Sequence, residues 1–295
     1  MKKIAFIVSA ALLTLLSLAS CSREEPAGGS QRITLDAVIG APTRATTYGK
    51  SEVFNPGDQV SLYAWTGSSE FIPSDLVVSG VVNELQQNGS WKSASDMFWK
   101  NAVSPHYFLG IYPARTVTNF TADSYELKPA EYEASDLLVA TNVTGLKAQN
   151  DPVKLTFDHM MAKLNVNLTF RNQWDGEPTV TAVSATAKKT ATIDYLNKLV
   201  TATGSAAAVA LTSVKNSEWS GLQVPQSGVK TITVTIDGKD HVYTHNTDIP
   251  LGSGKFTTVN LVIGRDQIVL ASDITITDWT SQGDAIDGDV FKPAE

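Results

Sequence analysis

Apolar and polar residues alternate with a period of two in several parts of the sequence, and this pattern restricts the fold more than any other feature. The clearest runs are Ile33 to Ile39, Leu164 to Phe170 and Thr231 to Ile236. Successive side chains of a strand point to opposite faces of a sheet, so each run has one apolar face to bury. Helical periodicity of similar length is missing. The sequence therefore predicts an all-β fold in which sheets pack face to face.

Turn residues separate these runs. Asn55 to Asp58 precedes a strand predicted from Val60 to Trp65, and Asp237-Gly238 supplies a tight turn after the strand that ends at Ile236. These turns support the assignment of short strands to a sandwich.

The length and one proline suggest how the chain is divided. A chain of 295 residues is typical of about two domains. Asp151-Pro152 separates two apolar runs. We therefore predict an N-terminal β-sandwich domain at 32–150 and a C-terminal one at 151–295.

The N-terminus has the pattern of a secretory signal. A positively charged start precedes an apolar run from Ala5 to Ser20, which is shorter than the about 20 residues of a membrane span. Leu18-Ala19-Ser20-Cys21 resembles the lipobox of bacterial lipoproteins, in which the cysteine is acylated and begins the mature chain. We expect a signal peptide at 1–20, followed at 21–31 by lipidated Cys21 and a flexible tether.

Charge and cysteine content restrict the partners and the location. The chain has 23 Lys and Arg against 30 Asp and Glu, a formal net charge of −7. An acidic chain without a basic run is a poor ligand for nucleic acid. Its single cysteine cannot form an intramolecular disulfide. Acyl chains on Cys21 would attach the protein to a membrane without spanning it, as in an outer-membrane or cell-surface lipoprotein.

The histidines do not predict a metal or catalytic site. His241 and His245 have the spacing that binds zinc on a helix, but they flank the strand-like residues Val242 to Thr244. Four residues of a strand span about 13 Å, too far for one metal. His159 follows Asp158, yet no Ser nucleophile elbow and no usable Cys accompany it. We interpret His159 as a buried or edge histidine.

Two further groups of residues have some features of a calcium site or a sugar-binding site. Asp284, Asp287 and Asp289 partly resemble a calcium loop, but the EF-hand spacing and its distal Glu are absent. The sequence predicts no enzyme, no cofactor and no metal site. Three of the six tryptophans end strand patterns and are expected in the core: Trp65, Trp99 and Trp279. The other three lie among small polar residues and could present exposed rings to a sugar: Trp91, Trp174 and Trp219.

The order of several blocks resembles the fimbrillin and Mfa-like family of Bacteroidetes. The blocks are Phe54 to Trp65, Met97 to Trp99, Tyr107 to Pro113, Ser135 to Ala140, Leu155 to Leu164, and Phe256 to Trp279 followed by Ser281 to Gly283. The resemblance covers essentially all of the chain after the signal. It implies two tandem transthyretin-like Greek-key β-sandwich domains in a type V pilin-like subunit, which assembles with other pilin subunits and supports adhesion.

The resemblance also implies assembly by strand exchange, in which an Arg-directed protease removes the first strand and another subunit fills the groove. The predicted strand-exchange segment has four inward-facing residues: Ile33, Leu35, Ala37 and Ile39. A polar, Pro-broken stretch with Arg44 follows and fits a cleavage site, although Arg23 and Arg32 compete with it. Cutting after Arg44 would release the strand together with the lipid anchor.

Alternatives stay open for the role in a fimbria. Gln267 to Trp279 is a better donor strand than the tail 280–295, in which alternation is poor. A subunit that accepts a strand without donating one would be a tip protein, and an uncut subunit would stay as a lipidated anchor. A glycan-binding surface lipoprotein is the alternative function, with a host or glycan ligand.

Overall fold

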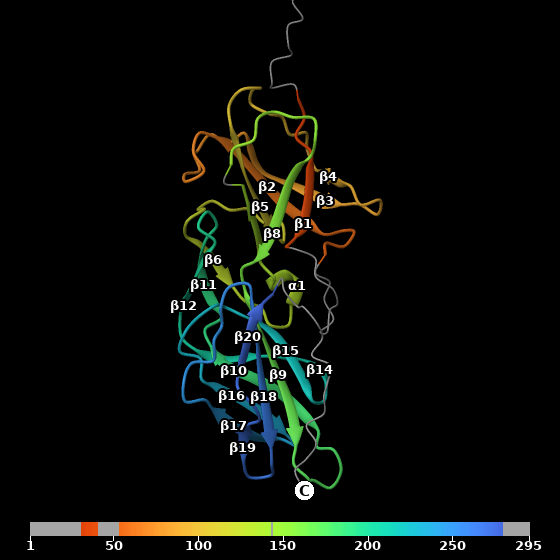
Figure 1. The fold of residues 1–295 in the computed structure, drawn as a ribbon, viewed down its shortest axis with the longest axis vertical. Helices are drawn as coiled ribbons and strands as arrows, with labels where there is room; N and C mark the ends of the chain where they lie inside the picture. Colours follow the sequence, from red (N-terminus) through yellow and green to blue (C-terminus); the bar gives the residue numbers. More distant parts are fainter. Residues whose placement is uncertain (1–30, 41–52, 143, 280–295) are drawn as a thin grey trace, which may run out of the picture.

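The computed structural model describes residues 31–40, 53–142 and 144–279 (Figure 1). Within these ranges the regular elements are 20 strands and a single helix of 4 residues, α1 (Tyr132–Ser135). None of the described helical residues forms a segment long and apolar enough to cross a membrane. The predicted all-β fold is confirmed.

A seven-stranded sheet fills the upper half of the molecule as drawn in Figure 1. Its strands are β1 (Leu35–Ile39), β2 (Gln59–Thr66), β3 (Val78–Leu85), β4 (Trp91–Ser93), β5 (His106–Tyr112), β7 (Leu138–Thr141) and β8 (Val153–His159). Their order is β1-β8-β7-β5-β2-β3-β4. β1 runs parallel to β8, whereas all other neighbours are antiparallel. β1 is therefore a sheet edge, next to the strand that lies furthest from it in the sequence.

Apolar side chains cover both faces of this sheet. On β2, Val60 and Leu62 belong to a core cluster that also contains the buried residues of β1 and β8. Tyr63 and Trp65 point to the other face and belong to a second cluster, which continues through the lower half of the molecule. The alternation along β2 thus separates an upper core from a larger shared one.

Three further sheets form the lower half. Their strands are β6 (Asp123–Glu126), β9 (Ala162–Phe170), β10 (Val180–Ala187), β11 (Thr190–Asp194), β12 (Leu199–Thr203), β13 (Ala207–Ala210), β14 (Thr212–Lys215), β15 (Glu218–Gln223), β16 (Thr231–Ile236), β17 (Lys239–Thr244), β18 (Lys255–Ile263), β19 (Ile268–Leu270) and β20 (Thr275–Asp278). The sheet orders are β12-β11-β6, β13-β10-β16-β17 and β14-β15-β9-β18-β19, with β20 also paired to β18. The four-stranded and six-stranded sheets bury their apolar faces in the larger core.

The strands predicted from the clearest alternation are present in the structure. Ile33 to Ile39 contains β1, and the other two clear runs correspond to β9 and β16. The predicted turn after β16 has positive φ at both central residues, 49° at Asp237 and 78° at Gly238. Such a backbone suits a tight hairpin, because these residue types tolerate the left-handed region.

The change of sheet comes later than the predicted boundary at 150/151. β8 lies beyond that boundary in the sequence, yet it belongs to the seven-stranded sheet. β9 begins after Met160 and Met161 and belongs to the six-stranded sheet. β6 precedes the boundary but pairs with β11 of the lower half. The sheets are therefore interleaved along the chain, and the division into two domains stays a prediction.

Candidate functional site

β1 lies along β8 in a parallel pairing that places Ile39 opposite Phe157. Backbone hydrogen bonds extend the pairing beyond both ends of β1. The Val153 N–H donates to the Thr34 carbonyl at 2.8 Å, and the Gly40 N–H donates to the Phe157 carbonyl at 2.9 Å. Parallel pairs are slightly less stable per residue than antiparallel ones. The predicted exchange strand is thus held on this side by the weaker kind of ladder.

The residues just before β1 pair with a second segment, which follows β4. The Ile33 N–H donates to the Met97 carbonyl at 2.8 Å, and the Trp99 N–H donates to the Gln31 carbonyl at 3.0 Å. Residues 31–33 therefore pair with 97–99, and the residues from Thr34 onward pair with β8. Removing the segment would break both pairings and expose the part of the upper core that it covers.

Arg32 is fixed at the start of this segment. Its guanidinium donates to both carboxylate oxygens of Asp96, at 2.6 and 2.8 Å, and lies 5.8 Å from the centroid of the Phe98 ring. Both partners of the ion pair are exposed, so solvent screens their attraction. A protease needs an extended and accessible backbone, and the backbone around Arg32 is already paired. This geometry makes Arg32 a poor competitor for cleavage.

The predicted inward face of the strand is buried. Ile33, Leu35 and Ala37 are 3%, 5% and 7% exposed, while Val38 on the opposite face is 49% exposed. Ile39 is half-buried and packs against the same cluster. The alternation predicted for this strand is confirmed, and its role in strand exchange stays a prediction.

The groove under β1 is closely packed. The Phe157 ring lies directly on the backbone of Gly110, where an added Cβ would be 2.5 Å from the Phe157 Cζ atom. Phe54 meets Phe157 edge to face with ring centroids 5.3 Å apart, and it meets Trp91 in the same way at 5.2 Å. Aromatic pairs of this geometry are favourable beyond their buried area. These aromatic rings are therefore closely packed in the same core cluster as the buried residues of β1.

Several predicted features lie outside the described residues. They are the signal peptide at 1–20, the lipidation site Cys21, the cleavage site Arg44 and the acidic residues Asp284, Asp287 and Asp289. Lipidation and cleavage stay predictions.

The burial of the tryptophans differs from the expectation. Trp65, Trp99 and Trp279 are buried as predicted. Trp219 is only 7% exposed, so the expectation of an exposed ring is wrong at this position. The reason is that the Trp219 side chain packs in the larger core cluster, and its Nε1–H donates to the Asn216 carbonyl at 3.2 Å.

Trp91 and Trp174 are both half-buried, in different surroundings. Trp91 packs edge on against Phe54 at the upper sheet. Trp174 follows β9 and lines a cavity in the lower half together with His241. Of the three predicted sugar contacts, Trp174 is thus the one placed at a cavity among the described residues.

The histidines occupy the structural positions that were predicted. His159 is buried, and its Nδ1 lies 2.8 Å from Oδ1 of Asp136. His241 lies within β17, whereas His245 follows that strand and its Nδ1 is 2.6 Å from the Tyr243 hydroxyl. Across the described ranges, no group of three or more His, Cys, Asp or Glu residues could hold a metal ion.

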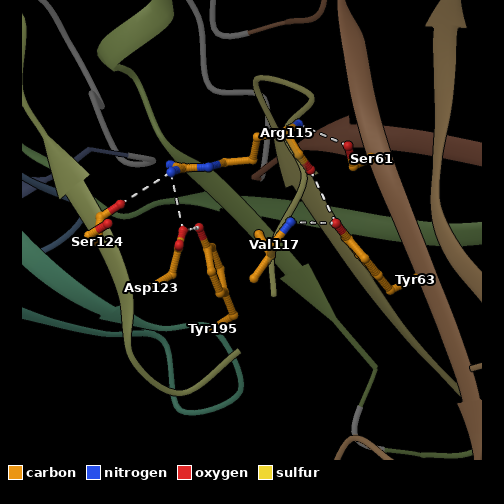
Figure 2. Close-up of polar contacts among 7 residues, drawn as sticks. All are labelled: Ser61, Tyr63, Arg115, Val117, Asp123, Ser124 and Tyr195. Atoms are coloured by element: carbon orange, nitrogen blue, oxygen red, sulfur yellow. Dashed lines mark hydrogen bonds and ion pairs between the residues drawn. The ribbon is translucent and has the colours of Figure 1, made fainter. Parts of the chain in front are cut away.

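A polar cluster that the sequence did not predict joins β2 to the lower half (Figure 2). The Tyr63 hydroxyl accepts a hydrogen bond from the Val117 N–H at 3.0 Å and donates to the Arg115 carbonyl at 3.2 Å. The Arg115 N–H in turn donates to Oγ of Ser61 at 2.9 Å. The segment after β5 is thereby attached to β2 at several points.

The Arg115 side chain connects this cluster to β6. Its Nη2 lies 3.1 Å from Oδ2 of Asp123 and donates to the Ser124 carbonyl at 3.3 Å, both on β6. The Tyr195 hydroxyl, just after β11, donates to the same Asp123 oxygen at 2.7 Å. Burial raises the pKa of Tyr63, and burial together with the hydrogen bond to Asp123 raises the pKa of Tyr195. Both hydroxyls therefore stay protonated as donors.

No spacing in the sequence relates these residues, because they come from β2, the segment after β5, β6 and the end of β11. The segment after β5 lies along β2, and the pairing of β6 with β11 brings Tyr195 to Asp123. The cluster thus connects the upper and lower halves.

The predicted donor segment is not one continuous strand. β19 pairs with the end of β18, from Leu261 to Ile263, and β20 pairs with its beginning, from Lys255 to Thr258. Ile276 on β20 is 44% exposed. Gln267 to Trp279 thus forms a broken edge along β18, and its use as a donor stays a prediction.

Comparison with known proteins identifies the family. The profile of the fimbrillin-like family matches residues 43–279. A candidate cell adhesion protein from Bacteroides uniformis is 18% identical with a TM-score of 0.63, over 84% of this chain and 99% of that chain. A second one, from Bacteroides ovatus, is 14% identical with a TM-score of 0.64, over 86% of this chain and 99% of that chain.

A fimbrial protein from Bacteroides vulgatus is 13% identical with a TM-score of 0.53, over 85% of this chain and 100% of that chain. At these identities the likeness concerns the fold. No curated protein sequence matches the chain. Because the family profile extends over most of the sequence, the chain belongs to the fimbrillin-like family.

Proposed function

We propose that this protein is a subunit of a cell-surface fimbria, anchored by lipid on Cys21 until a protease cuts after Arg44. In this proposal β1 leaves with the anchor, and a strand of another subunit takes its place. The observation that carries the proposal is β1 itself. It is a short edge strand with buried apolar residues, joined to Val53 through a segment that contains Arg44.

The energetics favour replacement of a lost β1. Burying a large aliphatic side chain stabilises a protein by about 1.5–3 kcal/mol. Ile33 and Leu35 are both buried in this way, and their loss would also expose the aromatic floor of the groove. Net stabilities of domains are about 5–15 kcal/mol. The free energy gained by covering an open groove would therefore strongly favour binding of a new strand by β-augmentation.

The proposed role is structural and adhesive rather than catalytic. The similar solved structures include candidate cell adhesion proteins and a fimbrial protein. We extend that class of role to this chain, with other pilin subunits as its partners and the cell surface as its location.

Limited proteolysis tests the proposal. The purified lipoprotein in detergent is treated with an Arg-specific protease, the new N-terminus is sequenced, and the product is run on an SDS gel without heating. We expect a fragment that starts at Ala45 and SDS-resistant multimers. The Arg44→Lys variant is the control: it should give no fragment that starts at Ala45 and should stay monomeric.

Other results would contradict parts of the proposal. A fragment that starts at Ile33 would show cleavage after Arg32, which leaves β1 in place. Stable monomers after cleavage at Arg44 would contradict polymerisation and favour the tip role. Labelling with a radioactive fatty acid tests the anchor, and the label should be lost in Cys21→Ser.

A further inference from the structure

A cavity of about 610 Å³ lies at the end of the molecule remote from β1. It is formed by the connections between β9 and β10, between β16 and β17, and between β18 and β19. The strand registers bring these connections together. Phe170 pairs with Ile263, which in turn pairs with Ile268, and Val180 pairs with Ile236. Strand ends from both lower sheets therefore meet at the lower end seen in Figure 1.

One part of the cavity is lined by aromatic rings. Trp174 and His241 line it, with ring centroids 6.2 Å apart and an interplanar angle of 61°. His241 is only 7% exposed. Among the described residues, the buried Nε1 of Trp174 has no hydrogen-bond partner. Buried polar groups in native proteins normally have partners, so this donor beside the cavity points to a ligand.

The imidazole of His241 is suited to a neutral polar ligand. Burial lowers its pKa, with a further contribution from Lys239. A neutral imidazole offers one donor and one acceptor. A hydroxyl group can satisfy both, since it too is a donor and an acceptor.

The rim of the cavity carries charges of both signs. Asp237 and Asp266 supply acceptors, Lys239 supplies a donor, and Arg265 is positioned by Asp175, with Nη2 3.6 Å from Oδ2. The lining has four carboxylates against two cations, and this excess of negative charge disfavours an anionic ligand. The described residues offer no cluster of three metal-ligating side chains here, which argues against a cation. An aromatic wall with a few convergent polar groups, in a volume between about 300 and 1,000 Å³, is typical of a small-molecule site.

We propose that this cavity binds a neutral pyranose residue of a glycan. The apolar face of the sugar would pack on the Trp174 side, and its hydroxyl groups would bond to His241, Asp237, Asp266 and Lys239. This inference does not rest on strand exchange. The cavity lies at the opposite end from β1, so it would stay open in a subunit whose groove is filled.

Saturation-transfer NMR on the uncleaved protein tests the site. The probes are methyl β-D-galactopyranoside, methyl α-D-mannopyranoside and N-acetyl-D-glucosamine, with N-acetylneuraminic acid as the charged comparison. We expect transfer to at least one neutral sugar and none to the acid. The matched variants are Trp174→Phe and Trp91→Phe, which alter the two half-buried tryptophans. The first should weaken binding at least tenfold in calorimetry, and the second should leave it unchanged.

Two polar variants guard against a folding defect in Trp174→Phe. Asp237→Asn and Asp266→Asn keep the side-chain size, and Asn tolerates the positive φ of 49° at position 237. Each should weaken the sugar severalfold without lowering the melting temperature. The proposal is overturned if none of the neutral sugars shows transfer, or if binding is unaffected by Trp174→Phe and both Asp variants. Binding of oligolysine in place of sugars would equally overturn it, since the rim would then be a site for basic peptides.

Discussion

The imidazole of His159 stacks on the indole of Trp279, with ring centroids 3.9 Å apart and an interplanar angle of 3°. His159 ends β8 of the seven-stranded sheet, and Trp279 follows β20 on the edge of the six-stranded sheet. The Nζ atom of Lys163 lies 5.7 Å from the same indole ring. One tryptophan therefore attaches the exposed edge strand to the upper half.

Replacing this tryptophan tests how the edge strand is held. Trp279→Ala should lower the free energy of unfolding by about 3–5 kcal/mol, because a buried Trp leaves both a cavity and an unstacked imidazole. Urea unfolding measures the loss. Hydrogen exchange should also rise in β20 more than in β9. Equal exchange of β20 in the variant and the wild type would contradict this attachment.

The Tyr63 hydroxyl is expected to hold the segment after β5. Tyr63→Phe removes the acceptor of the buried Val117 N–H and should cost about 1–3 kcal/mol in the free energy of unfolding. Tyr107→Phe is the control, since the Tyr107 hydroxyl has no hydrogen-bond partner among the described residues and the variant should change stability by less than about 0.5 kcal/mol. Similar losses in both variants, measured by urea unfolding, would contradict the role of the Tyr63 cluster.

The two faces of β1 should respond differently to truncation. Leu35→Ala removes a buried side chain and should cost about 2–5 kcal/mol, whereas exposed Val38→Ala should have little effect. Arg32→Gln breaks an exposed ion pair and should cost less than about 1 kcal/mol. Thermal unfolding of the three variants measures these losses of stability, and Leu35→Ala should lose the most. A larger loss for Val38→Ala than for Leu35→Ala would show that the strand register is wrong.

His106 makes the protein sensitive to acid. It is fully buried, its Nε2 accepts from the Lys100 N–H at 3.0 Å, and its Nδ1 lies 2.9 Å from the Ser104 carbonyl. These contacts require a neutral ring with the proton on Nδ1. Burial is the main cause that lowers its pKa below the usual 6.5.

The sign of this pH dependence follows from linkage. The unfolded chain takes up a proton near pH 6.5 and the folded chain only at lower pH. Stability is therefore complete above pH 6.5 and falls as the pH decreases below it, by at most about 1.4 kcal/mol per pH unit for one histidine. Urea unfolding between pH 7 and pH 5 measures the slope. The slope should decrease in His106→Gln, and an unchanged slope would contradict the assignment.

The sequence predicted the parts of the fold that depend on local pattern. β1, β9, β16 and the turn at Asp237-Gly238 follow from alternation and turn residues within a few positions. The direction of pairing did not follow, because a strand with one apolar face fits a parallel or an antiparallel neighbour equally well. The parallel pairing of β1 with β8 joins residues more than a hundred positions apart.

The sites were predicted less completely. Tyr63 meets Arg115 because the segment after β5 lies on β2, and Tyr195 joins them because β6 pairs with β11, which no local pattern indicates. Trp219 was predicted to be exposed because polar residues surround it in the sequence, yet its side chain packs in the larger core cluster. From the sequence, His241 was interpreted as structural. It lies beside Trp174 because three turns that are distant in the sequence meet at the cavity.

The most direct test of the account is replacement of β1 by a peptide. The lipoprotein is cleaved after Arg44 in the presence of excess synthetic peptide with the sequence of residues 33–40, which contains no arginine, and native mass spectrometry records the product. We predict monomers that each carry one peptide, and multimers when the peptide is omitted or its Leu35 is replaced by Asp. Cleaved monomers that stay folded and bind no peptide would contradict the claim that the groove under β1 requires a strand.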